Sequence, residues 1–207
     1  MPTCLLIVLM GVSGSGKSSI GHALSSVLNS EFVDADDFHS NENKIKMSKG
    51  IPLSDQDRFP WLLQIQKYVA SRFQISNSLQ LPCSSSTNSC TNYLVLACSA
   101  LKKSYRSILS GTPTLENNSS QFDVLTKNLD YKTVFVLLSC SKNTLLSRLK
   151  SRTNHFVNQT LLDSQLKTLE TLFSPTDNAI FIDTENKSIS VSVHEIYSAL
   201  QKLIPPG

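Results

Sequence analysis

The chain has 207 residues, of which 40% are hydrophobic and 17% are charged. This length and composition predict one soluble folded domain and exclude an intrinsically disordered chain, which would combine low hydrophobicity with a high net charge. The 19 basic and 16 acidic residues give a formal net charge of +3. That charge is too small to indicate a nucleic-acid-binding protein, which would normally carry a basic cluster or stripe.

The first predicted element is a strand at residues 5–10, within an apolar run that begins at Cys4. No basic region precedes the run and it is too short to cross a bilayer, so it resembles neither a signal peptide nor a membrane span. The five cysteines lack CxxC spacing, which argues against a disulfide framework or a zinc site; they are Cys4, Cys83, Cys90, Cys98 and Cys140. We therefore expect a cytoplasmic protein without membrane contact.

A phosphate-binding motif separates this strand from the first predicted helix, residues 17–29. Residues 11–18 read GVSGSGKS and match the pattern G-x-x-x-x-G-K-[ST] in full, in the strand-to-helix setting that the motif requires. In such a loop the backbone N–H groups and the helix N-terminus bind phosphate, the lysine reaches the β- and γ-phosphates, and the hydroxyl ligates Mg²⁺. A Gly/Ser-rich turn without a ligand is the competing interpretation. The candidate nucleotide-binding residues are Gly11, Ser13, Gly14, Ser15, Gly16, Lys17, Ser18 and Ser19.

Acidic residues follow the second predicted strand, residues 31–34. Asp34, Asp36 and Asp37 lie at the carboxyl end of that strand, the edge at which doubly wound sheets bind ligands. Phosphoryl transfer to an alcohol needs one carboxylate to orient and deprotonate the hydroxyl and another to organise Mg²⁺. Two acids at positions i and i+2 fit these roles, although a solvated acidic helix cap would look the same. No N-K-x-D-like element follows a later strand, which argues against a GTPase.

The rest of the chain continues to alternate strands and helices. Further strands are predicted at residues 93–97, 134–138 and 179–182, and further helices at 38–49, 60–73, 100–109, 142–152, 160–172 and 191–203. Residues 76–92 and 110–121 lack periodic apolar positions and are expected to be inserted surface loops. The pattern predicts a single three-layer α/β domain over residues 1–207, with a five-stranded parallel sheet flanked by helices.

From residue 34 onward the chain resembles the gluconokinase family, and the match is collinear over nearly the whole length. The matching residues include Asp34-Ala35-Asp36-Asp37-Phe38-His39, Asn43, Lys46-Met47, Asp55, Asp57-Arg58, Pro60-Trp61, Lys102, Tyr105-Arg106, Arg148, Arg152, His155-Phe156, Ser164-Gln165 and Leu169-Glu170. The resemblance implies a P-loop kinase related to shikimate and nucleoside monophosphate kinases. It would transfer the γ-phosphate of ATP to the 6-hydroxyl of D-gluconate, giving 6-phospho-D-gluconate and ADP, a step that feeds the pentose phosphate pathway.

The resemblance also suggests roles for individual residues. It places Asp34 with Ser18 on Mg²⁺ and Asp36 on the substrate hydroxyl. His39, Asn43 and Lys46 are spaced to share one helix face, which would suit a polyhydroxy acid as well as it would suit a solvated surface. Arg58 could bind the sugar-acid carboxylate in bidentate fashion. Lys102 and Arg106, one helical turn apart, complete the expected substrate contacts together with His155.

A helical lid is expected at about residues 148–172. In related kinases, arginines in this place neutralise charge on the transferring phosphoryl, so Arg152 joins Lys17 and Asp36 as a candidate catalytic residue and Arg148 is a candidate nucleotide contact. Solvated helix arginines are the alternative. Members of the family often form dimers, which makes a homodimer an expectation here. Two other functions stay open: a kinase for another small molecule such as shikimate or a nucleotide, and a nucleotide-binding protein without turnover.

Overall fold

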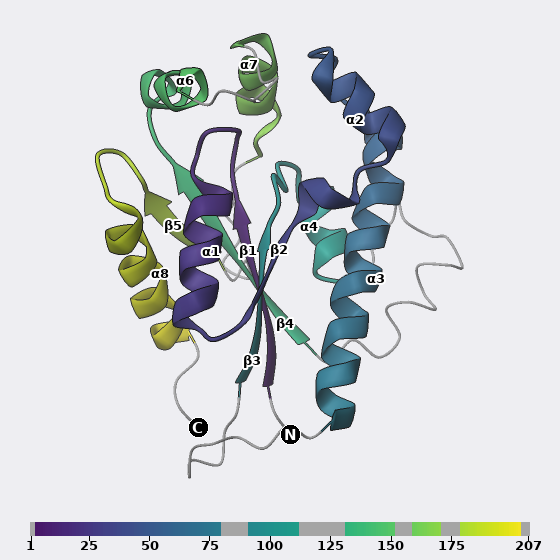
Figure 1. The fold of residues 1–207 in the computed structure, drawn as a ribbon, viewed down its shortest axis with the longest axis vertical. Helices are drawn as coiled ribbons and strands as arrows, with labels where there is room; N and C mark the ends of the chain where they lie inside the picture. The colour runs from purple at the N-terminus through teal and green to yellow at the C-terminus, as the bar shows by residue number, and fades with distance from the viewer. Residues whose placement is uncertain (1–2, 80–90, 112–130, 152–158, 171–178, 204–207) are drawn as a thin grey trace.

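The structure is a computed structural model that describes residues 3–79, 91–111, 131–151, 159–170 and 179–203. Within these residues, five parallel strands form one sheet in the order β2-β3-β1-β4-β5. They are β1 (Thr3–Met10), β2 (Glu31–Asp34), β3 (Thr91–Ala97), β4 (Tyr131–Ser139) and β5 (Ala179–Asp183). The predicted parallel α/β sheet is confirmed, and each predicted strand is present (Figure 1).

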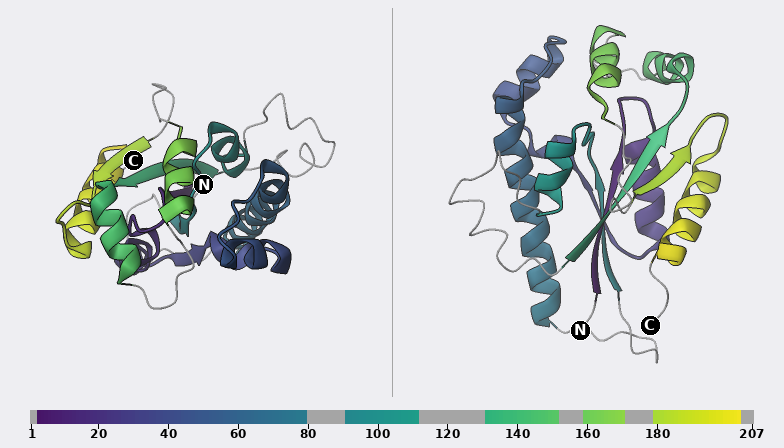
Figure 2. Two further views of the ribbon diagram at one scale, coloured as in Figure 1. Left: turned by 90° about the horizontal axis from the view of Figure 1, so that it is seen from above. Right: turned by 180° about the vertical axis from the view of Figure 1, so that it is seen from behind.

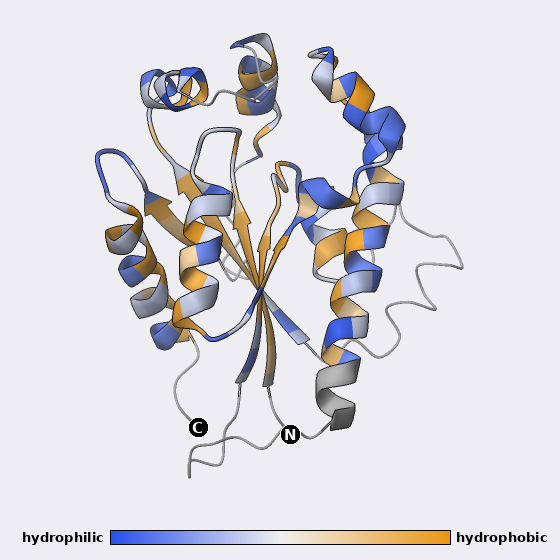
Figure 3. Cartoon of the chain, viewed as in Figure 1, coloured by the Kyte–Doolittle hydropathy of each residue, from blue (hydrophilic) through white to orange (hydrophobic). Residues whose placement is uncertain are grey.

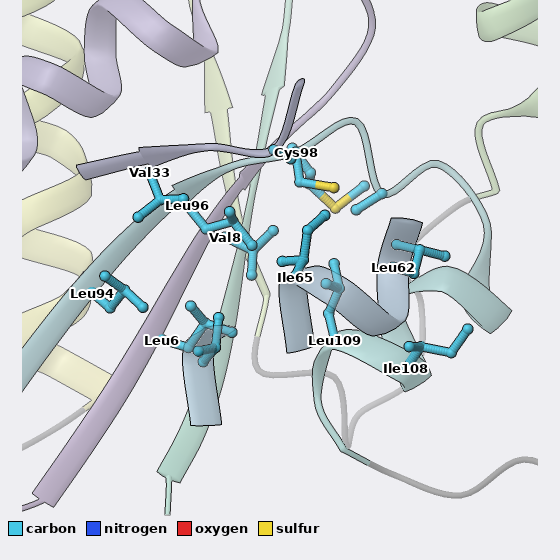
Figure 4. Packing of buried hydrophobic residues seen from close by; sticks show 14 of the residues in the cluster. Leu6, Val8, Val33, Leu62, Ile65, Leu94, Leu96, Cys98, Ile108 and Leu109 are labelled. Carbon is cyan, nitrogen blue, oxygen red and sulfur yellow. The ribbon is translucent and has the colours of Figure 1, made fainter. Parts of the chain in front are cut away.

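The central strand β1 is buried on both faces because helices cover both sides of the sheet. Side chains alternate along a strand, so Leu5, Ile7 and Leu9 pack on one face and Leu6 and Val8 on the other. The first set meets α1 (Lys17–Val27) and α8 (Ile189–Leu203), and the second meets α3 (Asp55–Leu79) and α4 (Lys103–Leu109). Figure 4 shows the second cluster, and Figure 3 shows the apolar strands between these helices.

The register of the sheet brings two functional segments to the same level. Leu9 of β1 and Asp34 of β2 are both paired with Ala97 of β3. The phosphate-binding motif after β1 and the acidic segment after β2 therefore leave the sheet at one edge, on either side of the end of β3.

Short elements stand over this edge of the sheet (Figures 1 and 2). They are the 3-10 turn η1 (Ala35–Phe38) and the helices α2 (Asn41–Ser48), α6 (Lys142–Lys150) and α7 (Gln159–Thr168). The predicted helix 38–49 is thus wrong at its start. The Ser40 side chain accepts a hydrogen bond from Asn43 N at 3.2 Å and caps α2, which leaves His39 outside the helix.

The helix α3 begins before Pro60 and ends later than expected. The predicted start was residue 60, and proline is common in the first turn of a helix. In the structure, Ser54 and Asp57 form a reciprocal cap: Ser54 N donates to Asp57 Oδ2 at 2.9 Å, and Asp57 N donates to Ser54 Oγ at 3.2 Å. This capping pair starts the helix at Asp55. At its other end α3 continues to Leu79, into the predicted loop 76–92.

The other helix bounds agree with the predictions to within about three residues, except at the end of α7, which stops at Thr168. The remaining parts of the predicted loops (80–90 and 112–121) and of the lid (152–158 and 171–172) lie outside the described residues. The three cysteines that the structure describes, Cys4, Cys98 and Cys140, are free thiols. Among the described residues, no helix is long and apolar enough to span a membrane.

Candidate active site

The loop between β1 and α1 has a backbone that requires glycine. Gly11 has φ 141° and a Cβ there would lie 2.6 Å from the Leu138 carbonyl oxygen, while Gly16, with φ 101°, turns the chain into α1. Other residues rarely adopt these angles. The loop therefore ends with the N-terminus of α1 at the sheet edge, the geometry of a phosphate site.

Asp34 links this loop to the acidic segment. Ser18 Oγ donates to Asp34 Oδ2 at 2.7 Å, and Asp36 N donates to Asp34 Oδ1 at 3.1 Å. The Lys17 ammonium lies at the mouth of the loop, where it donates to the carbonyls of Gly11 (3.0 Å) and Val12 (3.1 Å). A hydroxyl and a carboxylate in direct contact beside a phosphate loop form a donor set that suits Mg²⁺, which takes few protein oxygens and completes its shell with phosphate and water.

A cavity of about 440 Å³ opens between the loop, η1, α3 and α7. Nine of the predicted site residues line it. They come from the loop and helix α1 (Ser13, Gly14, Gly16, Lys17, Ser18), from the acidic segment (Asp34, Asp36, His39) and from α3 (Arg58). The candidate lysine, the candidate base and the candidate carboxylate-binding arginine therefore face one space.

His39 is a neutral member of this lining. Its ring is buried and stacks on Trp61, with 4.3 Å between ring centroids and 13° between planes. Burial, helped by the nearby charges of Arg58 and Lys44, lowers the pKa of His39 to about 4. Its Nε2 lies 3.8 Å from Asp36 Oδ1. The imidazole is thus uncharged at neutral pH and can serve as both hydrogen-bond donor and acceptor.

Arg58 is held toward the cavity by its own surroundings. Its guanidinium donates to the Leu53 carbonyl and to the Tyr105 hydroxyl at 3.5 Å, and lies 5.7 Å from the Tyr105 ring centroid. Tyr105 in turn donates a hydrogen bond to Asp55, whose carboxylate also accepts one from the Lys102 ammonium at 2.7 Å. The hydrogen bonds from Lys102 and Tyr105 lower the pKa of Asp55. Lys102, predicted to touch substrate, instead holds this cluster and does not line the cavity.

Asn43 and Lys46 also turn away from the cavity, because both bind Asp57. Asn43 Nδ2 donates to the Asp57 carbonyl at 3.0 Å, and Lys46 Nζ donates to the Asp57 carboxylate at 2.7 Å. The Lys46 hydrogen bond, together with those from Ser54, lowers the pKa of Asp57 to about 2. The expected polar face shared with His39 is not formed, and these two residues join α2 to the start of α3 instead.

The two described arginines beyond β3 bind backbone. Arg106 is buried and donates to the carbonyls of Ala100 (3.2 Å) and Leu101 (3.1 Å). Arg148 donates to Thr184 O at 2.7 Å and reaches the Gly14 carbonyl of the phosphate loop at 3.5 Å. Neither lines the cavity. Gly11, Ser15 and Ser19 belong to the loop and α1 without lining it, and Arg152 and His155 lie outside the described residues.

The lining residues without a functional assignment from the sequence include Gln165 and Trp61. Gln165 of α7 accepts a hydrogen bond from Ser13 N at 2.8 Å, and the only sequence signal for it is the Ser164-Gln165 pair in the family resemblance. The sequence predicts that Trp61 belongs to the core, and its side chain is buried. Trp61 also lines the cavity, and its indole N–H donates to Ala35 O at 2.7 Å. An aromatic residue on a helix face gives no sequence signal that separates these two functions.

The sheet, the phosphate loop and the facing carboxylates define a P-loop kinase, a class that uses ATP and a divalent metal ion, generally Mg²⁺. A family model described as an AAA domain matches residues 6–175. The chain is 43% identical over 194 residues to a probable gluconokinase of Xenopus tropicalis, covering 93% of this chain and 91% of that protein. It therefore belongs to the gluconokinase family.

Solved structures agree with this assignment. A gluconokinase from Sinorhizobium meliloti 1021 superposes with a TM-score of 0.71 at 34% identity, covering 98% of this chain and 95% of that one. A sugar kinase from Janibacter sp. superposes with a TM-score of 0.74 at 31% identity, covering 99% and 97% of the two chains.

Proposed function

We propose that this protein transfers the γ-phosphate of ATP to the 6-hydroxyl of D-gluconate, producing 6-phospho-D-gluconate and ADP. The observation that carries the proposal is the single cavity that Lys17, Asp36 and Arg58 line together. Membership of the gluconokinase family supports gluconate as the acceptor.

The nucleotide would lie along the loop, with its phosphates on the N-terminus of α1. The N–H groups at the end of the loop and the Lys17 ammonium would then offset the negative charge on the phosphates. Ser18 and Asp34, already in contact at 2.7 Å, would hold Mg²⁺. When bound, this ion would neutralise negative charge on the phosphates during transfer.

The acceptor would fill the part of the cavity between η1 and α3. Asp36 would accept a hydrogen bond from the 6-hydroxyl and take its proton as the oxygen attacks phosphorus. Arg58, fixed by Leu53 and Tyr105, would bind the carboxylate at the far end of the substrate. The neutral imidazole of His39 would exchange hydrogen bonds with a hydroxyl of the chain between these two ends.

Several predicted roles stay proposals. Arg152 would neutralise charge on the transferring phosphoryl, and His155 would contact the substrate. Arg148 would contact the nucleotide beside the phosphate loop. Lys102 would act through Asp55 and Tyr105 on the position of Arg58. A homodimer, a cytoplasmic location and the absence of nucleic-acid binding likewise remain predictions of the sequence.

A coupled assay of ADP release, run with gluconate, shikimate and nucleoside monophosphates as acceptors, tests the proposal. We expect turnover that depends on gluconate and Mg²⁺, and a loss of several orders of magnitude in a folded Lys17→Ala variant. ADP release with another acceptor in preference to gluconate would assign a different kinase activity. ATP binding without turnover of any acceptor would leave a nucleotide-binding protein.

A further inference from the structure

One side chain of helix α7 that the proposed mechanism does not use binds the phosphate loop by a hydrogen bond. The Gln165 carbonyl oxygen accepts a hydrogen bond from Ser13 N at 2.8 Å, and the same side chain lines the cavity together with Leu161 of α7. Because Ser13 N can only donate, the oxygen of the amide must face the loop. The two N–H donors of Gln165 therefore lie on the other terminal atom of this planar group.

The position of Gln165 is restrained by the packing of its neighbour Leu162. Leu162 is fully buried in a small apolar cluster with Leu145 and Leu149 of α6 and with Val12 of the phosphate loop itself. The loop and α7 thus share a core, which restrains the distance between them.

Beyond the end of α7, Glu170 binds the start of α4. Glu170 N donates to Leu101 O at 2.9 Å, and the Glu170 carboxylate accepts from Lys103 N at 2.5 Å. Buried Arg106 adds a hydrogen bond to the Glu170 carbonyl at 3.4 Å. These contacts hold the chain that follows α7, so the helix is anchored on either side of Gln165.

We propose that Gln165 is a further catalytic residue for phosphoryl transfer, and that it also positions the phosphate loop. Its carbonyl oxygen fixes the phosphate loop at Ser13 by accepting a hydrogen bond from Ser13 N. Its amide N–H groups donate to the transferring phosphoryl in the cavity. The inference rests on the proposed kinase function, since it concerns the same site. The inference gives a role to Gln165 of the Ser164-Gln165 pair, which the sequence analysis identified only through the resemblance to the gluconokinase family.

Two substitutions separate the two halves of this role. Gln165→Met keeps the length and volume of the side chain but removes both the acceptor and the donors. Gln165→Glu keeps an acceptor for Ser13 N but replaces the donors with a negative charge beside the phosphates. Lys167→Ala, an exposed position on the same helix, is the matched control. Steady-state kinetics, the melting temperature and the binding of a fluorescent ATP analogue are measured for all three.

We expect both Gln165 variants to lose at least about tenfold in kcat, the size of effect that one hydrogen bond to a charged group can produce. The KM for gluconate should change little, and the melting temperatures should stay near that of Lys167→Ala. Gln165→Met should also bind the ATP analogue more weakly, because the loop loses its support. A purely structural role predicts instead that Gln165→Glu is active and that any loss in Gln165→Met follows its melting temperature.

Turnover within about twofold of wild type in Gln165→Met, or an active Gln165→Glu, would overturn the inference while leaving the gluconokinase function in place. A wild-type protein that does not phosphorylate gluconate would overturn the function instead. The inference would then be decided by the ATP analogue, and unchanged binding in Gln165→Met would reject it.

Discussion

Asp36 and Asp37 are neighbours in the sequence but face different surroundings. Both residues are exposed, but Asp36 lines the cavity, with a carboxylate oxygen 3.8 Å from His39 Nε2, whereas Asp37 does not line it. We expect Asp36→Asn to lower kcat by about a hundredfold or more, because the primary hydroxyl loses its base. Asp37→Asn should stay within about twofold in kcat. Equal losses in the two variants would show that the wrong carboxylate has been assigned.

The buried imidazole of His39 predicts a defined pH dependence of stability. Unfolded, His39 takes up a proton near its ordinary pKa of 6.5, but in the folded protein it does so only near 4. Between these values the unfolded state binds more protons, so acidification favours unfolding; the penalty is absent above about pH 6.5 and complete below about pH 4. Melting temperatures measured from pH 7 to pH 4 should therefore fall less in His39→Gln than in wild type. Parallel curves for the two proteins would contradict this.

At the scale of single residues, the sequence predicted the members of the contiguous phosphate-binding motif. It did not predict which residues the lysines of the site bind. The phosphate loop is a contiguous pattern whose geometry follows from its glycines, so Lys17 and Ser18 lie in the cavity lining as predicted. A lysine or an amide takes whichever partner is nearest in space. Nothing in the spacing of Lys46 or Lys102 reveals that Asp57 and Asp55 lie closer to them than the cavity does.

At the scale of elements, α1 packs so closely on β2 that it excludes a methyl group. A Cβ at Gly21 would lie 2.3 Å from Cε2 of Phe32, whose ring is itself packed against His22 with centroids 4.0 Å apart. Helix propensity alone favours Gly21→Ala by about 1 kcal/mol, but overpacking typically costs about 1–3 kcal/mol. We expect a net loss of stability in urea unfolding.

A Phe32→Ala background provides the control for this prediction. With the ring removed, Gly21→Ala should become neutral or stabilising, and the double-mutant cycle then measures the clash directly. A stabilising Gly21→Ala in the wild-type background would mean that the ring moves aside without cost.

Most helices and strands could be predicted from the sequence. The errors at the starts of α2 and α3 occur where side chains cap the helix. Apolar runs such as that of β1 and the helical periodicity of α8 identify elements that are buried by packing. The break at His39 and the early start of α3 depend instead on single hydrogen bonds of Ser40 and Ser54. Both serines begin short capping patterns, Ser40 with Asn43 and Ser54 with Asp57, whereas the predicted helices began at Phe38 and Pro60.

At the scale of the whole molecule, the cavity draws its lining from segments between Ser13 and Gln165, so a ligand there should stabilise the entire fold. Ligand at a hundred times its Kd adds about 2.7 kcal/mol, which corresponds to a rise of roughly 5–10 °C in the melting temperature for a chain of this size. We expect this rise with ATP and Mg²⁺. It should be smaller with ATP and EDTA, and nearly absent in Lys17→Ala.

The central position of β1 also bears on how the chain folds during synthesis. β1 is made first, yet its two neighbours are β3, which begins at Thr91, and β4, which begins at Tyr131. At about 5–20 residues per second, a ribosome needs roughly ten seconds to make the second neighbour. Through that interval the apolar strand that leads into the phosphate loop has an open edge, the kind of surface that aggregates or binds chaperones. We therefore expect the strand that positions the phosphate loop to be open to chaperone binding or aggregation until the sheet is complete.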